Sequence, residues 1–298
     1  MKFATPRGNT PCHNSPAVSH ELLEVAVAAA RAGGTVLGDF FRKRPLEPEL
    51  KTENDFVTLA DRAAETAVLA EIRRHYPDHR ILAEEGGWTG GNGSDYSWIV
   101  DPLDGTTNFL RGLPVYGVSV ACSRGEEVMA GAVYDPEGGN LFKATRGGGA
   151  YWNDKRMEVS KLPDLRGAFV ATGYPFKARE AVDLYLDTFR SVFARAQAIR
   201  RCGAAALDLA YTAAGVYDGF FEFRLSPWDI AAGALLIEEA GGLVSDLDGG
   251  DGYMEGGNVI AGAPFVQQDL LEVVGRHVSE KQLDELVPRP GVPTTSAC

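Results

Sequence analysis

The sequence predicts a layered α+β protein, with an antiparallel sheet in the first half of the chain and a smaller α/β arrangement in the second. Two observations lead to this fold class. From residue 81 to residue 144, short apolar segments are separated by turn residues such as Arg124-Gly125-Glu126, which is the pattern of an antiparallel meander. After Gly147-Gly148-Gly149, helical and strand patterns alternate, as they do in α/β layers.

Two helices are expected ahead of the first strand. Ser19 is expected to cap a long apolar helix that ends near Phe41. Lys51 to Asp55 is expected to form a polar loop. A second helix from about 58 to 75 then stops at Pro77, because proline lacks the backbone donor that a helix needs. The strands of the first half are expected near 81–83, 96–100, 118–122, 128–134 and 141–144.

The second half is expected to contain four helices and four short strands. The helices lie near 179–196, 204–214, 229–240 and 266–275, and the strands near 197–200, 219–223, 243–245 and 258–262. Both ends of the chain are rich in proline and polar residues and lack a periodic apolar pattern. We therefore divide the chain into a disordered N-terminal extension (1–16), a first half (17–150), a second half (151–278) and a C-terminal tail (279–298).

The composition of the chain excludes several classes of protein. Its 298 residues suffice for a large core, and its net charge of −12 argues against direct binding to a nucleic-acid backbone. The N-terminus shows no secretory signal and no apolar stretch is long enough to cross a bilayer, so no membrane association is expected. The four cysteines are scattered without a CxxC pair, which indicates reduced thiols and a cytoplasmic protein.

The stretch DPLDGTTNF at residues 101–109 places two aspartates directly after the apolar run Trp98-Ile99-Val100. Pro102 is expected to end this strand, Asp104-Gly105 to form a turn, and the following threonines to open a helix. The simplest interpretation is structural, with an aspartate that caps the next helix.

Acidic residues end two further elements and favour a functional interpretation. Glu84-Glu85-Gly86-Gly87 follows a short apolar strand, and Asp229 begins an apolar helix after Phe220–Phe223. If these groups converge, two carboxylates about 4 Å apart repel by roughly 4 kcal/mol at an effective dielectric near 20. Hard oxygen ligands without cysteine or histidine favour Mg²⁺ as the compensating charge. Gly105 and Thr106, at a helix start, would offer backbone N–H groups to a phosphate.

These motifs resemble the inositol monophosphatase family, the magnesium-dependent, lithium-sensitive sugar phosphatases. The resemblance rests on DPLDGTTNF, on AEEGG at 83–87 and on WDIAAGALLIEEAGG at 228–242, and it covers roughly residues 20–265. It implies a layered α-β-α-β-α fold, in which the first half binds two or three Mg²⁺ ions, the second half binds the substrate, and both form one catalytic unit. It also implies a homodimer that hydrolyses a small anionic sugar or inositol phosphate, above all myo-inositol monophosphate, by attack of a metal-activated water.

The resemblance further implies a role for each matching position. The first metal would be bound by Glu84, Asp101, the carbonyl of Leu103 and Thr106; the second by Asp101, Asp104 and Asp229; and a weaker third by Glu84 and water. The attacking water would be oriented by Thr106, with Asp61 behind it, and Glu84 would take part in catalysis. The substrate would be bound by Gly105, Thr106, Glu222, Lys51 and Ala205, with a weaker case for Asp208.

Several alternatives stay open on the sequence. Glu222 also suits a strand residue that faces solvent, and Lys51 suits a solvated lysine in a loop. Fructose-1,6-bisphosphate, histidinol phosphate and 3′-phosphoadenosine 5′-phosphate are rival substrates, although Thr107-Asn108-Phe109 favours inositol phosphate. A binding role in a transcription complex is the alternative from another functional class, and the intact set of acidic residues argues against it as the only role.

Overall fold

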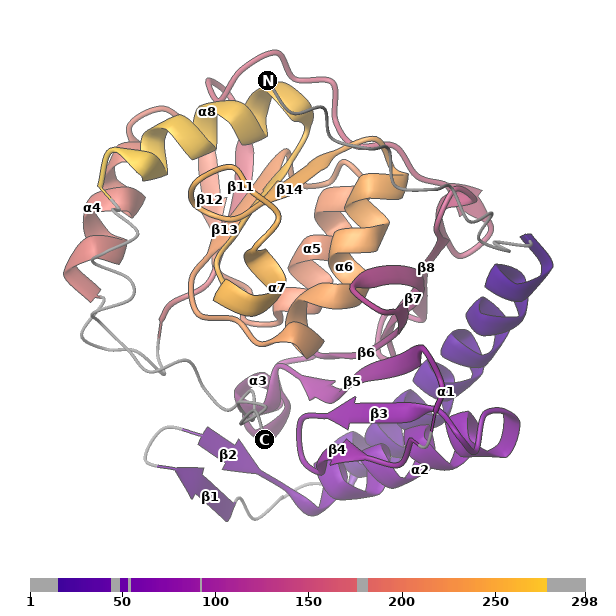
Figure 1. The fold of residues 1–298 in the computed structure, drawn as a ribbon. Coiled ribbons are helices and arrows are strands. Elements are labelled where there is room, and N and C mark those ends of the chain that lie inside the picture. Colours follow the sequence, from indigo (N-terminus) through magenta and orange to yellow (C-terminus); the bar gives the residue numbers. More distant parts are fainter. Residues whose placement is uncertain (1–15, 44–48, 53–54, 92, 176–181, 278–298) are drawn as a thin grey trace, which may run out of the picture.

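The computed structural model describes residues 16–43, 49–52, 55–91, 93–175 and 182–277. Its elements form five layers, in the order helix, sheet, helix, sheet, helix (Figure 1). The first layer contains α1 (Pro16–Arg42) and α2 (Leu59–His75), which pack together on one face of the first sheet. The helices between the two sheets are α5 (Ala205–Ala213) and α6 (Pro227–Glu239).

Within the described residues, eight strands form the first sheet in the order β10-β9-β8-β7-β6-β5-β3-β4. Their bounds are β3 (Arg80–Ala83), β4 (Gly87–Thr89), β5 (Tyr96–Asp104), β6 (Gly117–Arg124), β7 (Glu127–Asp135), β8 (Asn140–Thr145), β9 (Gly149–Trp152) and β10 (Lys155–Arg156). From β5 to β10 each strand pairs antiparallel with the next, as the meander pattern predicted. The exception in this sheet is the pair β3 and β5, which is parallel.

The second sheet is smaller and mixed, with the order β12-β11-β13-β15-β14. Its strands are β11 (Phe169–Thr172), β12 (Ala198–Arg200), β13 (Gly219–Glu222), β14 (Leu243–Ser245) and β15 (Val259–Gly262), and the short helix α7 (Tyr253–Gly256) joins the last two. β11 is parallel to both of its neighbours, whereas β15 is antiparallel to β13 and β14. The combination of helices and mixed strands agrees with the α/β pattern expected for this half.

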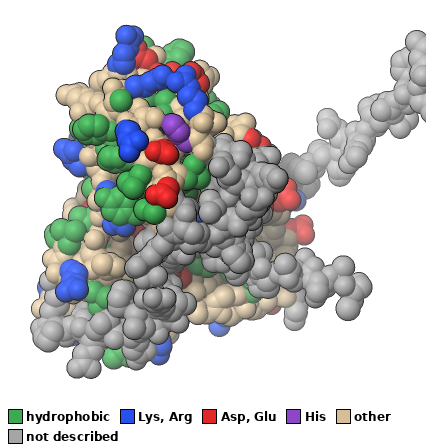
Figure 2. Space-filling view, turned by 90° about the vertical axis from the view of Figure 1, so that its left-hand side faces the viewer, with side chains coloured by type: hydrophobic (Ala, Val, Ile, Leu, Met, Phe, Trp, Pro, Cys, Tyr) green, Lys and Arg blue, Asp and Glu red, His purple; other side chains and the backbone are tan. Residues whose placement is uncertain are grey.

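The outer layer consists of α8 (Pro264–Gly275), which packs on the second sheet, and α4 (Val182–Phe193) beside it. Figure 2 shows apolar and basic side chains interspersed on the face that carries these helices. The exposed apolar residues of α4 and α8 include Leu186, Phe193 and Phe265. Among the described residues, no helix combines the length and apolar character that crossing a membrane requires.

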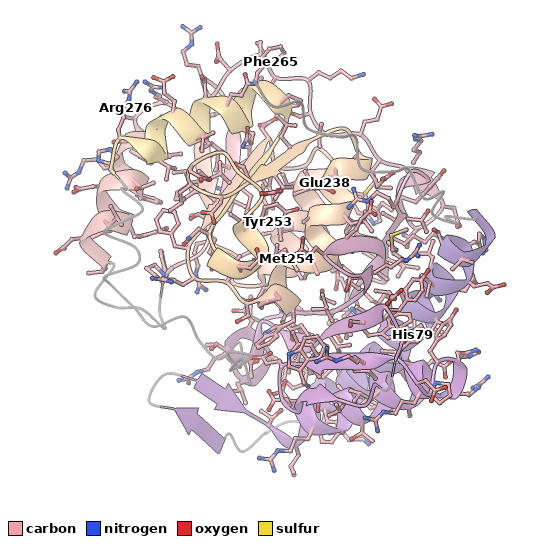
Figure 3. The ribbon with its side chains drawn as sticks, in the orientation of Figure 1. His79, Glu238, Tyr253, Met254, Phe265 and Arg276 are labelled. Atoms are coloured by element: carbon pink, nitrogen blue, oxygen red, sulfur yellow. The ribbon has the colours of Figure 1, made fainter. Side chains whose placement is uncertain are left out.

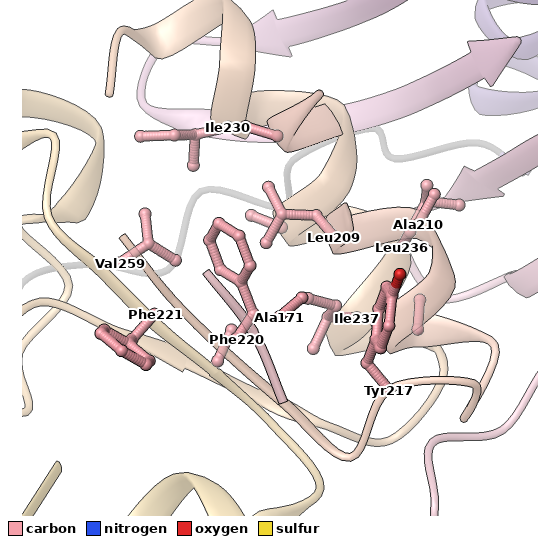
Figure 4. Packing of buried hydrophobic residues seen from close by; sticks show 14 of the residues in the cluster. Ala171, Leu209, Ala210, Tyr217, Phe220, Phe221, Ile230, Leu236, Ile237 and Val259 are labelled. Atoms are coloured by element: carbon pink, nitrogen blue, oxygen red, sulfur yellow. The ribbon is translucent and has the colours of Figure 1, made fainter. Parts of the chain in front are cut away.

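The core between the sheets is built from α5, α6 and the strands that face them. Figure 4 shows Leu209 from α5, Ile230 from α6 and Phe220 from β13 gathered in this layer, and all three side chains are fully buried. Gly131 of β7 lets α6 approach the first sheet, because a Cβ atom at Gly131 would lie only 3.1 Å from the Cα of Ala232. This close packing fixes the position of α6 between the two sheets.

The glycine-rich loop at 147–149 ties the first sheet to the end of α6. The backbone N–H groups of Gly147 and Gly149 donate to the carboxylate of Glu239 at 2.7 and 2.8 Å. Both glycines have positive φ angles, which side-chain-bearing residues adopt only with strain. Arg146 adds an ion pair with Glu238 at 2.6 Å. The far end of α6 is therefore held by the hairpin between β8 and β9.

Some local predictions are wrong. α1 begins at Pro16, whose missing N–H needs no partner in the first turn of a helix, so Ser19 lies inside the helix and does not cap it. β5 continues through Pro102, because the ladder is irregular between Asp101 and Asp104 and does not need the donor that proline lacks. The loop predicted around Lys51 belongs instead to a hairpin of β1 (Glu49–Thr52) and β2 (Asp55–Val57).

The predicted division of the chain into parts stays a prediction. The first sheet continues to Arg156, a few residues beyond the division expected at residue 150. Residues 1–15 and 278–298, which hold most of the predicted terminal segments, lie outside the described residues.

Candidate active site

The parallel pairing of β3 with β5 brings two acidic segments together. Ala83 lies opposite Val100 in this pair, and the backbone N–H of Glu84 donates to the carbonyl of Val100 at 3.2 Å. Because parallel strands run in the same direction, their carboxyl ends reach the same edge of the sheet. Glu84, which directly follows β3, and Asp101, which lies within β5, are therefore neighbours at this edge.

The irregular end of β5 turns Asp104 toward the second half of the chain. The Asp101 carboxylate accepts a hydrogen bond from the Leu103 N–H at 3.0 Å, which holds the bulge. The Asp104 carboxylate accepts hydrogen bonds from the N–H groups of Ala205 at 3.2 Å and Ala206 at 2.8 Å, at the N-terminus of α5. The structural interpretation of DPLDG is thus correct in part, but Asp104 caps α5 and not α3 (Thr106–Arg111), the next helix along the chain.

Asp229 reaches the same place from the first turn of α6. Its carboxylate accepts a hydrogen bond from the Ser226 N–H at 2.7 Å in a capping box, with Pro227 at the start of the helix. Carboxylate oxygens of Asp101, Asp104 and Asp229 lie within 4.8 Å of one another. Such a group of oxygen ligands could hold a divalent metal ion, and Asp101 and Asp104 are only 1% and 8% exposed.

Burial and mutual repulsion raise the pKa values of these carboxyls. Burial, followed by the charge of Asp229, raises the pKa of Asp104 to about 7, although the N–H groups of α5 oppose the shift. Burial raises the pKa of Asp101 well above its usual range, and the charges of Glu84 and Asp104 add to the effect. Without a cation the cluster therefore retains protons, and a divalent ion would let it ionise fully. The donor set fits Mg²⁺, since it consists of hard oxygen atoms.

A cavity of about 320 Å³ opens above the acidic cluster. Most of the predicted site residues line it, namely Glu84, Asp101, Leu103, Asp104, Gly105, Thr106, Ala205, Glu222 and Asp229. Thr106 begins α3, and its hydroxyl donates to the carbonyl of Leu103 at 3.1 Å. The backbone N–H of Ala205 is taken by Asp104, so Ala205 lines the cavity without offering that donor freely.

Glu222, at the end of β13, supplies a further buried carboxyl to this cavity. It fits because Gly173 has no side chain, and any Cβ atom there would collide with the Glu222 carboxylate. Burial raises the pKa of Glu222 well above its usual range, Asp208 and Asp229 raise it further, and Arg201 opposes the shift. The alternative of a strand residue facing solvent is therefore wrong, since Glu222 is buried.

Arg201 and Tyr174 line the same cavity and were missed in the sequence. The Arg201 guanidinium lies over the Tyr174 ring, 4.8 Å from its centre, so the arginine is held at the cavity wall. Arg201 lies within the range that resembles the family, but no motif described above includes it. No sequence signal pointed to Tyr174.

Two predicted residues, Asp61 and Asp208, lie outside the cavity lining, and a third cannot be placed from the described residues. Asp61 is buried at the start of α2, where its carboxylate accepts hydrogen bonds from the N–H and hydroxyl of Thr58 at 3.0 and 3.3 Å. Asp208 is buried in α5, outside the cavity lining, and its pKa is raised by burial and then by Asp104. The side chain of Lys51 lies outside the described residues, so its predicted role stays a prediction.

A family model and individual relatives were compared with this chain. The family model described as "Inositol monophosphatase family" matches residues 19–283. The protein named "Nus factor SuhB" from Escherichia coli K12 is 47% identical over 253 residues, 85% of this chain and 95% of the relative. The "Inositol-1-monophosphatase" of Mesorhizobium japonicum is 45% identical over 261 residues, 87% of this chain and 98% of the relative.

Solved structures give the same result for the fold. The crystal structure of the extragenic suppressor protein suhB from Bartonella henselae has a TM-score of 0.83 at 40% identity and covers 87% of this chain and 100% of its own. The inositol monophosphatase from Anabaena has a TM-score of 0.79 at 35% identity, with 88% and 98% coverage. The predicted layered fold is confirmed, and the chain belongs to the inositol monophosphatase family.

Proposed function

We propose that this chain hydrolyses the phosphate monoester of a small polyol in a Mg²⁺-dependent reaction, with myo-inositol monophosphate as its preferred substrate. The observation that carries the proposal is the convergence of Asp101, Asp104 and Asp229 at one cavity that also receives Glu84 and Glu222. The relative named "Inositol-1-monophosphatase" is 45% identical to this chain, which supports the choice of substrate.

The acidic residues would divide the binding of Mg²⁺ among them. Asp101 interacts with both Glu84 and Asp104. It would serve two ions, one with Glu84, the Leu103 carbonyl and Thr106, and the other with Asp104 and Asp229. A third ion would use Glu84. Bound Mg²⁺ would supply positive charge for the phosphoryl oxygens and make a water molecule more acidic.

Thr106 would position the attacking water. Its hydroxyl group donates its proton to the carbonyl of Leu103. The hydroxyl oxygen can therefore only accept further hydrogen bonds. A water that donates to this oxygen would be held in one orientation, which lowers the entropic cost of attack on phosphorus. Asp61 is proposed to support Thr106 from behind, in addition to its observed bonds to Thr58.

The opposite wall would bind the substrate. The Glu222 carboxyl can accept from a polyol hydroxyl, or donate to one when its raised pKa leaves it protonated. Gly105, Ala205 and Lys51 would contribute to binding the phosphate and the ring. Arg201 and Arg224 add positive charge to a cavity wall that also carries several carboxylates. The reaction would thus depend on positioning and charge neutralisation, as phosphoryl transfer generally does.

Phosphate release from a panel of substrates tests the proposal. The panel contains myo-inositol 1-phosphate, fructose-1,6-bisphosphate, histidinol phosphate and 3′-phosphoadenosine 5′-phosphate, each with Mg²⁺ or EDTA, and with or without Li⁺. We expect the highest kcat/KM for the inositol phosphate, no release in EDTA and inhibition by Li⁺. A higher kcat/KM for another member would reassign the substrate, and release that persists in EDTA would contradict the metal requirement.

A role in a transcription complex is the second candidate. It is favoured by one observation, the 47% identity to relatives named "Nus factor SuhB" from Escherichia coli and Salmonella typhimurium. The direct partner would be a protein, because the net charge of −12 disfavours nucleic acid. Pull-down of RNA polymerase with the wild type and with Asp104→Asn separates the roles, since a binding role alone would survive the substitution. Light scattering would test the proposed homodimer.

A further inference from the structure

A second cavity, of about 450 Å³, lies on the other side of the start of α6. It forms because α6 makes its main contacts with β5 to β9, so the end of the first sheet that carries β3 and β4 extends beyond the helix. α7 faces this end of the sheet across the cavity. Figure 3 shows Tyr253 and Met254 on α7, above β3 and β5. A volume of this size is within the range of small-molecule sites, about 300–1,000 Å³.

A large part of the wall of this second cavity is aromatic or apolar. They include Trp88 from β4, Trp228 from α6, Tyr253 and Met254 from α7, and Ile99 from β5. Trp88 is 38% exposed, although it is a large apolar side chain. The guanidinium of Arg80 lies 4.3 Å from the centre of the Trp88 ring, outside the cavity lining, so this indole already takes part in a cation–π contact.

The charged residues that line this cavity are all acidic. Glu126, Asp251 and Glu255 line it, and no lysine or arginine does. None of the three carboxylates forms an ion pair in the part of the chain that the structure describes. A concave, partly apolar wall concentrates such a field, which attracts cations and repels a phosphate ester. These exposed carboxylates therefore disfavour a second site for the proposed substrate, because they do not form a buried cluster that would hold a neutralising metal ion.

We propose that the second cavity binds a small organic cation, an amine carried on a flat apolar body. The apolar body would pack against the indole rings of Trp88 and Trp228, and the ammonium group would lie toward Glu126, Asp251 and Glu255. Flat rings bury apolar surface against indoles, and a cation gains from both the aromatic faces and the carboxylates. An anion would be repelled by the carboxylates of the wall. A fully polar cation would gain nothing from its apolar residues.

Calorimetric titration with tryptamine tests this site. Tryptamine carries an indole and a primary amine, and indole-3-propionate is the matched ligand with the same ring and the opposite charge. Excess Mg²⁺ in both titrations keeps the acidic cluster of the first cavity occupied. We expect tryptamine to bind with a Kd of about 0.1–1 mM, the range for a ligand of this size, and the anion to bind at least about tenfold more weakly.

Two triple variants that remove the same number of negative charges test whether tryptamine binds at the second cavity. The triple variant Glu126→Gln, Asp251→Asn, Glu255→Gln removes the negative charge of the cavity and keeps its shape. The control Glu24→Gln, Asp154→Asn, Asp183→Asn removes the same charge from exposed positions elsewhere. We expect about tenfold weaker tryptamine binding in the first variant and unchanged binding in the control, because nearby exposed pairs contribute modestly and distant ones are screened.

Several results would overturn the proposal. Equal binding of the two ligands would show that charge plays no part, and equal weakening in both triple variants would show only a general effect of net charge. Trp88→Ala provides an independent check, since it leaves every carboxylate in place and should also weaken binding. If light scattering shows instead that Trp88→Ala dissociates a dimer, the surface is a contact between copies of the chain and not a ligand site.

Discussion

The two cavities beside the first turn of α6 are both acidic, but their carboxylates differ in burial. In the first, Asp101 and Asp104 are almost inaccessible and are held by backbone N–H groups. In the second, Glu126 and Asp251 are exposed and unpaired among the described residues. Buried carboxylates cannot move apart, so their repulsion must be balanced by protons or a metal ion. The repulsion between exposed carboxylates is screened by water and salt. They can therefore favour a cationic ligand without needing a bound cation for stability.

The largest effect is expected for Asp104→Asn, which tests whether the first cavity depends on its charge. We expect phosphate release to fall by at least about 100-fold, since a charge that would hold Mg²⁺ is lost. The fold should persist, because asparagine keeps an oxygen that can accept the Ala206 N–H. Measurements are phosphate release and thermal unfolding without metal. Asp154→Asn, at an exposed position, is the matched control. An unfolded Asp104→Asn protein would indicate that capping α5 is the main role of this residue.

Removal of metal at two pH values tests the difference between the buried carboxylates of the first cavity and the exposed ones of the second. The folded-state pKa of Asp104, about 7, lies above its ordinary value of 3.8. Its protonation therefore stabilises the metal-free protein fully below that ordinary value, and this contribution is lost as the pH rises through about 7. Mg²⁺ binds the ionised form, so we expect it to raise the Tm by about 5 °C near pH 8 and by much less near pH 5.

Calorimetry with Mg²⁺ or EDTA at each pH measures this effect. A Tm increase that is the same at both pH values would mean that protons and Mg²⁺ do not compete for the cluster. The exposed carboxylates of the second cavity should not contribute, so the Glu126→Gln, Asp251→Asn, Glu255→Gln variant should show the same pH dependence as the wild type.

Glu222→Gln should have an intermediate effect, on binding more than on turnover. Glutamine keeps the shape that fits against Gly173 but loses the ionisable group that is proposed to contact a substrate hydroxyl. We expect KM to rise about tenfold with a smaller change in kcat, the range for one hydrogen bond to a charged group. Steady-state kinetics with inositol phosphate measure both constants. A fall in kcat at unchanged KM would instead place Glu222 among the groups that act on the reacting atoms.

The smallest effect on phosphate release is expected when the carboxylates of the second cavity are replaced. The Glu126→Gln, Asp251→Asn, Glu255→Gln variant should keep kcat/KM within about twofold of the wild type, since exposed charges at this distance are largely screened. The same phosphate assay measures it. A large loss of activity would show that the two cavities are coupled through Pro227 and Trp228, which line the second cavity and directly precede Asp229.

The sequence by itself indicated which acidic residues are candidates for the chemistry and roughly where most elements lie. Glu84, Asp101 and Asp229 were found because acidic residues at the ends of apolar segments are a local signal, and most strands were predicted from alternation along the chain. The family resemblance then assigned a role to each position. The structure adds to this for Asp61, which caps α2 and lies outside the cavity lining, so its role behind Thr106 stays a prediction.

Only the tertiary structure decided how these residues meet. The parallel register of β3 and β5, the capping of α5 by Asp104 and the contact of Arg201 with Tyr174 each join separate segments of the chain. Local patterns of polarity specify which face of an element is buried, but not which distant element covers it. The burial that raises the pKa of Asp104 has the same origin, because it arises only when both halves of the chain close around the carboxylates.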